Sequence, residues 1–199
     1  MAAAPFDLGA YLSEKFPSLS LGGGLLHRWQ LAVRFEVGIE RFRERAPKLY
    51  ESVFSAQDTC IVVSQDWPRN QLTPTAASRY FQVFLLPGAF DRVRLPALQR
   101  LEHTDMEDDD SVLQWVQLPA RSFSYEAVFQ GIANHDHART PSVSSRVYFL
   151  NQTTDILLHM YDDRGLDIIA ATSKPLTQIR LEFSDWILDV NHGQQGQAR

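Results

Sequence analysis

The sequence predicts an α+β fold: an antiparallel-leaning sheet that ends in a C-terminal three-stranded meander, with helices packed on it. Five stretches space their apolar residues at helical intervals, and seven short stretches have strand character. The last strands follow one another through short turns, as in antiparallel sheets. No linker-like composition divides the 199 residues. We therefore expect one domain over residues 1–199, with 190–199 as a frayed tail.

The first third of the chain is expected to form two helices and two strands. Leu8, Tyr11, Leu12 and Phe16 give the stretch 6–16 helical spacing. Residues 29–37 alternate large apolar and polar side chains, which is typical of a half-buried strand. Residues 42–54 carry an apolar stripe, and Pro47 inside it either kinks this helix or marks its start. A short buried strand is expected at 59–64.

The middle and the end of the chain contain further start signals. Thr73 followed by Pro74 is typical of the beginning of a helix. Strand character returns at 111–118, after which Ser124 is expected to cap another helix. Ser173 is expected to cap the last helix, and residues 186–190 to close the fold as a strand.

The C-terminal meander is predicted at 143–150, 156–161 and 166–171, where alternation is interrupted by two turn signals. The second turn contains Asp163, Arg164 and Gly165. A hairpin this tight needs a residue free of the Cβ clash, so Gly165 is expected to adopt a positive φ.

Charge is distributed unevenly along the chain, whose net value is −5. Residues 1–100 hold twelve Lys or Arg against nine Asp or Glu, whereas residues 101–199 hold seven against fifteen, six of them within 102–110. An acidic second half argues against tight binding of nucleic acid, although a local basic patch at Arg41, Arg43, Arg45 and Lys48 is an exception to it. The same field is compatible with a basic protein partner.

The single cysteine, Cys60, lies beside an apolar run and is expected to be buried and inert. One thiol forms no internal disulfide, so nothing indicates an oxidising compartment. The N-terminus has no secretory pattern, and no apolar stretch approaches the ~20 residues that a membrane span needs. We therefore expect a cytoplasmic protein that does not bind membranes.

Several segments resemble a small bacterial family that is classified only as a domain of unknown function. The specific ones are HMYDDRGLDIIA at 159–170 and DWILD at 185–189, and the similarity runs from Leu8 to Asp189. The resemblance implies a common fold unit and a bacterial source. It implies no catalytic residues.

One cluster of residues in the meander has the composition of a possible site: His159, Asp162, Asp163, Arg164 and Asp167. Grouped carboxylates can hold a hard cation, and a histidine can add a nitrogen ligand. Asp and Gly are also the usual turn formers, and an Asp can pair with Arg164 across a hairpin. We favour this structural interpretation and expect neither a metal nor a cofactor. His135 and His137, just after a helical stretch, are likewise expected to lie at a helix end.

Two functions remain open. The favoured one is a small acidic binding protein, immunity- or antitoxin-like, that acts by occupying a protein partner. The alternative is a metal-dependent hydrolase that uses Asp162, Asp163, Asp167 and His159. No nucleophile elbow, papain-like cysteine context or zinc-protease motif is present in the sequence, so we lean against an enzyme.

Overall fold

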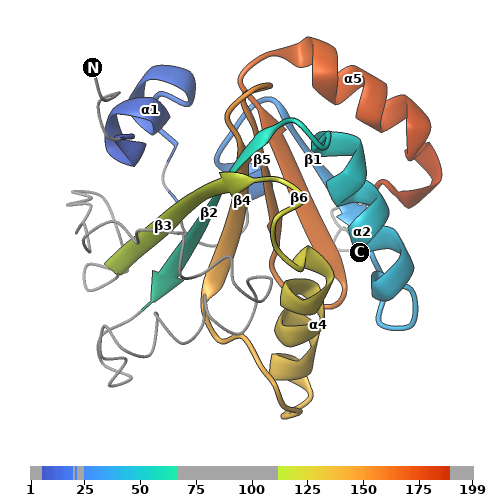
Figure 1. Cartoon of the computed structure of the whole chain (residues 1–199). Helices are drawn as coiled ribbons and strands as arrows, with labels where there is room; N and C mark the ends of the chain where they lie inside the picture. Colours follow the sequence, from blue (N-terminus) through green and yellow to red (C-terminus); the bar gives the residue numbers. More distant parts are fainter. Residues whose placement is uncertain (1–5, 20, 22–24, 67–111, 189–199) are drawn as a thin grey trace, which may run out of the picture.

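The computed structural model of the chain describes residues 6–19, 21, 25–66 and 112–188 (Figure 1). The helix expected after Thr73, the acidic run at 102–110 and the C-terminal tail lie outside the described residues. The described part is an α+β structure, as predicted, and its elements are α1 (Leu8–Lys15), η1 (Leu25–His27), β1 (Ala32–Glu36), α2 (Phe42–Val53), β2 (Thr59–Asp66), β3 (Val112–Pro119), α4 (Tyr125–Asp136), β4 (Arg146–Asn151), β5 (Ile156–Met160), β6 (Gly165–Ala170), α5 (Ser173–Glu182) and η4 (Ser184–Trp186).

The six strands form one sheet in the order β1-β6-β5-β4-β2-β3, and every neighbouring pair is antiparallel. The meander predicted from residue 143 onward is confirmed as β4, β5 and β6. In its register, Leu158 lies opposite Phe149 on β4 and opposite Ile168 on β6. Almost every residue of these three strands is buried, because they lie at the centre of the sheet and both of their faces are covered.

Helices cover the two faces of the sheet unequally. The helices α2, α4 and α5 pack on one face, and α1 lies on the other (Figure 1). Alternate residues of each strand point to opposite faces of the sheet. Phe149 and Leu158 therefore belong to the hydrophobic core under α2, α4 and α5, whereas Leu150 and Leu157 belong to the core under α1. Tyr50 of α2 is fully buried in the core under α2, α4 and α5, where its ring stacks on that of Tyr125 with centroids 4.0 Å apart.

Four local expectations need correction or refinement. The helix α2 begins at Phe42 and runs through Pro47 without interruption. The strand β1 begins at Ala32 rather than at residue 29. Neither Ser124 nor Ser173 caps a helix through its side chain, and Ser173 is already the first helical residue of α5. The described residues after η4 form an isolated bridge, between Ile187 and Phe35, instead of a strand.

The outer edge of β1 is closed by groups from elsewhere in the chain. The backbone N–H of Leu188 donates to the carbonyl of Arg34 at 2.8 Å. Side chains of Arg180 and Arg45 donate to the carbonyls of Ala32 and Glu36, at 2.6 and 2.7 Å. These bonds satisfy carbonyls that an edge strand would otherwise expose. They also bring Arg45 and the residues after α5 to the end of the sheet where β1 leads into α2.

None of the helices in the described part of the chain has the length and apolar character needed to cross a membrane.

Candidate functional site

The five residues singled out in the meander lie close together in the chain, but their side chains have separate partners. His159 and Asp167 are cross-strand neighbours on β5 and β6, and Asp162, Asp163 and Arg164 form the connection between these strands. The contacts of each residue show what its side chain does in the fold.

Asp162 organises the turn. Its Oδ1 accepts from the backbone N–H groups of Arg164 and Gly165, at 2.8 and 3.1 Å. Its Oδ2 accepts from Nε and Nη2 of Arg164, at 2.8 and 2.5 Å. The expected pairing of an Asp with Arg164 is therefore present, with two N–H groups of the guanidinium donating to one carboxylate oxygen.

Gly165 does not have the positive φ predicted for it. Among the described glycines, Gly38 has this conformation, with φ +71°. Gly165 is instead the first residue of β6, and a Cβ atom built on it would lie 1.7 Å from Oη of Tyr161. The carboxylate of Asp162 holds the turn, and glycine is needed at 165 because a tyrosine ring lies against it.

Asp163 joins the turn to α4. Its Oδ2 lies 2.6 Å from Nε2 of His137, the residue that follows the last turn of that helix. The Asp163 side chain is buried, so this contact supplies its polar partner. The expectation that His137 lies at a helix end is met by the structure, and its ring also reaches the β5–β6 turn.

Asp167 is fully buried and pairs with Arg34 on the neighbouring strand. Its two carboxylate oxygens accept from Nε and Nη2 of Arg34, at 2.6 and 2.8 Å. The backbone N–H of Leu26 in η1 also donates to it, at 3.2 Å. These bonds connect β6, β1 and η1. The hydrogen bonds between Arg34 and Asp167 also raise the pKa of Arg34.

His159 is buried between strands and is not available as a ligand without rearrangement. Its Nδ1–H donates to the carbonyl of Val147 at 2.8 Å, and its ring lies 4.4 Å from that of Tyr148. Burial lowers its pKa to about 4, so the ring is neutral at physiological pH. Asp167 is the cross-strand neighbour of both His159 and Arg34, and the ring of Tyr148 extends this polar row through its contact with His159.

Within the residues that the structure describes, no three His, Cys, Asp or Glu side chains are grouped so that they could hold a metal ion. The acids of the meander cluster accept hydrogen bonds from Arg164, His137 and Arg34 instead.

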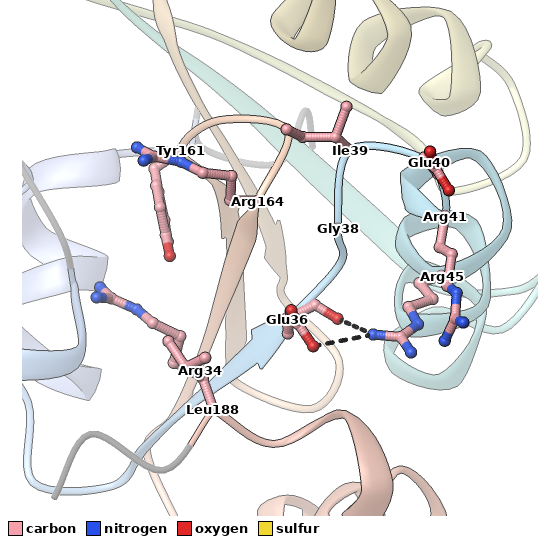
Figure 2. Close-up of a pocket in the computed structure, with 10 residues that line it drawn as sticks. All are labelled: Arg34, Glu36, Gly38, Ile39, Glu40, Arg41, Arg45, Tyr161, Arg164 and Leu188. Carbon is pink, nitrogen blue, oxygen red and sulfur yellow. Dashed lines mark hydrogen bonds and ion pairs between the residues drawn. The ribbon is translucent and has the colours of Figure 1, made fainter. Parts of the chain in front are cut away.

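A pocket of about 980 Å³ lies beside this cluster, at the end of the sheet where β1 leads into α2 (Figure 2). We call it the arginine pocket. It is lined by Arg34, Glu36, Gly38, Ile39, Glu40, Arg41, Arg45, Tyr161, Arg164 and Leu188. Of the predicted site residues, only Arg164 is in the lining; Asp162 and Asp167 lie behind it, as partners of Arg164 and Arg34. The sequence signal closest to this site is the basic patch that begins at Arg41.

The arginines of this pocket differ in how they are held. Arg34 and Arg164 are fixed from behind by Asp167 and Asp162. Arg45 contacts both the carbonyl and the carboxylate of Glu36, as the dashed lines in Figure 2 show. The Arg41 side chain is exposed and makes no hydrogen bond or ion pair with the described residues. The pocket thus combines oriented guanidinium groups with one that is free to reorient.

Tyr161 forms an aromatic wall of the pocket. The guanidinium carbon of Arg34 lies 4.6 Å from the centre of its ring. Burial raises the pKa of Tyr161, so its hydroxyl stays protonated at neutral pH. The aliphatic side chains of Ile39 and Leu188 complete the lining and are 55% and 43% exposed.

Comparisons with known proteins identify the family but no activity. The model of a family described as "Domain of unknown function (DUF3885)" matches residues 8–191. The chain is similar to "Uncharacterized protein YnaE" of Bacillus subtilis (strain 168), with 19% identity over 206 residues that cover 91% of this chain and 97% of that protein. No solved structure matches the chain. The resemblance expected from residues 159–170 and 185–189 is confirmed by these matches.

Proposed function

We propose that this chain, which belongs to the family described as a domain of unknown function (DUF3885), is a binding protein that acts by occupying a protein partner. In this proposal the contact site is the arginine pocket. The observation that carries it is the composition of the lining, in which arginines and a tyrosine stand beside exposed aliphatic side chains.

This composition is typical of the energetic centre of a protein–protein interface. Arginine and tyrosine are enriched at such centres because each offers a large contact area together with hydrogen-bonding groups. Arg34 and Tyr161 are stacked on each other, so both present a fixed surface before any partner arrives. A preformed surface loses less conformational entropy on binding.

The lining supports recognition better than catalysis. The ten described residues that line the pocket include no Ser, Thr, Cys or His, and of its two glutamates Glu36 is already in contact with Arg45. The alternative expectation, a metal-dependent hydrolase, gains no support from the geometry. Its acids are engaged by Arg164, His137 and Arg34, and His159 is buried against β4.

Within this proposal, the favoured class is an immunity- or antitoxin-like protein of the cytoplasm that covers the working surface of another protein. Its small size and net charge of −5 support that class. The acid-rich second half is the part expected to face basic groups of the partner. The arginine pocket would take a group of the opposite charge from the same partner.

Site-specific photo-cross-linking tests the proposal. A benzophenone amino acid at Ile39, on the pocket rim, is expected to give a discrete protein adduct in the bacterial host, and Arg41→Glu in the same chain should abolish it. Leu181 is a matched control, because it is an aliphatic residue of α5 that is 76% exposed and lies outside the lining. Equal adducts from both positions, or none from Ile39, would contradict the proposal.

A further inference from the structure

We infer that the group bound in the arginine pocket is a carboxylate carried on an aliphatic chain, such as an acidic side chain or a chain terminus beside a leucine-like residue. The inference rests on the proposed function, since it specifies the part of the partner that enters this pocket.

The N–H groups of Arg34 and Arg164 that do not bind Asp167 or Asp162 can bind a carboxylate. Arg34 and Arg164 each use Nε and Nη2 to bind an internal Asp, which leaves both N–H groups of Nη1 without a described partner. The side chain of Arg164 is 74% exposed, and that of Arg41 makes no ion pair with the described residues. A planar guanidinium offers parallel N–H groups that fit the two oxygens of a carboxylate.

The charge balance of the site favours a carboxylate over a phosphate. Among the described residues of the lining, four arginines face two glutamates, Glu36 and Glu40. The internal partners of Arg34 and Arg164 add the carboxylates of Asp167 and Asp162 directly behind the lining. The surplus positive charge of the lining is therefore offset by acids in contact with it. A singly charged group fits this balance better than a phosphate dianion, whose second charge would meet these carboxylates.

The rest of the lining selects the carrier of that carboxylate. Ile39 and Leu188 expose aliphatic surface, and the Tyr161 ring supplies an aromatic face. Burial of apolar surface contributes roughly 25 cal/mol for each Å² removed from water. A carboxylate on an aliphatic chain is stabilised both by the arginines and by burial of its apolar surface. A small inorganic anion is stabilised by the arginines alone.

Titration of the full chain with capped peptides tests this assignment. Acetyl-Leu-Glu-Leu-amide offers a side-chain carboxylate, and acetyl-Leu-Leu with a free terminus offers an α-carboxylate. Acetyl-Leu-Gln-Leu-amide is the neutral match. We expect at least one of the two acids to bind about tenfold tighter than the Gln peptide, as one charge-assisted hydrogen bond would give. Whichever acid binds tighter identifies the source of the carboxylate. Tighter binding of inorganic phosphate, or equal binding of the Glu and Gln peptides together with no preference for the free terminus, would overturn the inference.

Matched variants locate the binding. Arg41→Gln and Arg164→Gln should each weaken the acidic peptide several-fold and leave the Gln peptide unchanged. Arg121→Gln is the control, because Arg121 also pairs with an acid at the surface, Glu51, but lies outside the pocket. Equal loss in all three variants would overturn the assignment to this pocket. If the acidic peptides do not bind but the cross-linker at Ile39 still gives its protein adduct, only the carboxylate assignment is rejected. If the peptides bind but no adduct forms at Ile39, the proposed function is rejected.

Discussion

The phenol of Tyr161 fills the space that a Cβ atom on Gly165 would need. An ideal Cβ at 165 would lie 1.7 Å from Oη and 2.2 Å from Cζ of that ring. The ring is held in place by Arg34, whose guanidinium stacks on it at 4.6 Å. The glycine thus allows the aromatic wall of the arginine pocket to lie against β6.

Gly165→Ala is therefore expected to lower the free energy of unfolding by about 1–3 kcal/mol, the usual cost of overpacking. Urea unfolding measures this. The cost should shrink clearly when alanine is introduced in a Tyr161→Ala background, because the ring that it collides with is gone. An equal cost in both backgrounds would mean that the backbone conformation at 165, rather than the ring, requires glycine.

Asp167→Asn and Asp162→Asn are expected to differ in cost. Asp167 is fully buried, and its replacement leaves Arg34 facing a neutral amide, which should cost about 3 kcal/mol or more. Asp162 pairs with an exposed arginine, a contact worth about 0–1 kcal/mol, and asparagine keeps an oxygen for the two backbone N–H groups. Equal losses in denaturant unfolding would show that the Arg34–Asp167 pair is no more important than the turn.

Divalent metals are expected to leave the melting temperature unchanged. The carboxylates of Asp162, Asp163 and Asp167 already have Arg164, His137 and Arg34 as partners. Thermal melts with Mg²⁺, Mn²⁺, Ca²⁺ and Zn²⁺ check this, since a ligand of the native state raises its stability. A saturable stabilisation that Asp162→Asn abolishes would instead restore the metal-site interpretation.

Cys60 is expected to resist a thiol reagent in the native protein. The side chain is fully buried in β2, and burial raises the pKa of its thiol, so little thiolate is available for reaction. Labelling should therefore be slow in buffer and fast in denaturant. Rapid labelling without denaturant would show that this part of the sheet opens readily.

Local patterns predicted most of the described fold. Period-2 alternation with intervening turn residues identified β4, β5 and β6, since both signals are properties of neighbouring residues. Local patterns gave the wrong prediction where tertiary contacts determine the conformation or the role of a residue. Pro47 lies within a continuous α2, which is packed on the sheet through Ala46 and Leu49. Gly165 was assigned to the turn by its type, whereas its role depends on the ring of Tyr161.

The site was harder to predict, because its residues come from distant parts of the chain. The sequence groups Asp163 and Asp167 by proximity, but their partners, His137 and Arg34, lie 26 and 133 positions away. Such pairings depend on strand order, which a single sequence does not specify. The basic patch after β1 was visible in the sequence. Its meeting with Tyr161 and Leu188 follows only from the arrangement of β1, β6 and the segment after α5.

His159 is expected to make stability fall in mild acid. The folded protein holds the ring neutral, with a pKa of about 4 against an ordinary value of 6.5. The unfolded chain therefore takes up a proton between these values and the folded chain does not, so lowering the pH through this range favours unfolding. At 1.36 kcal/mol per pKa unit, the loss attributable to this residue is about 3 kcal/mol by pH 4.

Urea unfolding at intervals from pH 7 to pH 4 measures this effect, and His159→Gln isolates it. The variant should be less stable at pH 7, because it loses the ring that packs on Tyr148, but its stability should depend less steeply on pH. His135→Gln, which removes an exposed histidine of α4, is the matched control for the loss of one imidazole. Parallel curves for wild type and His159→Gln between pH 6.5 and 4 would mean that the folded protein accepts a proton at this ring, in conflict with its burial between Tyr148 and the neighbouring strands.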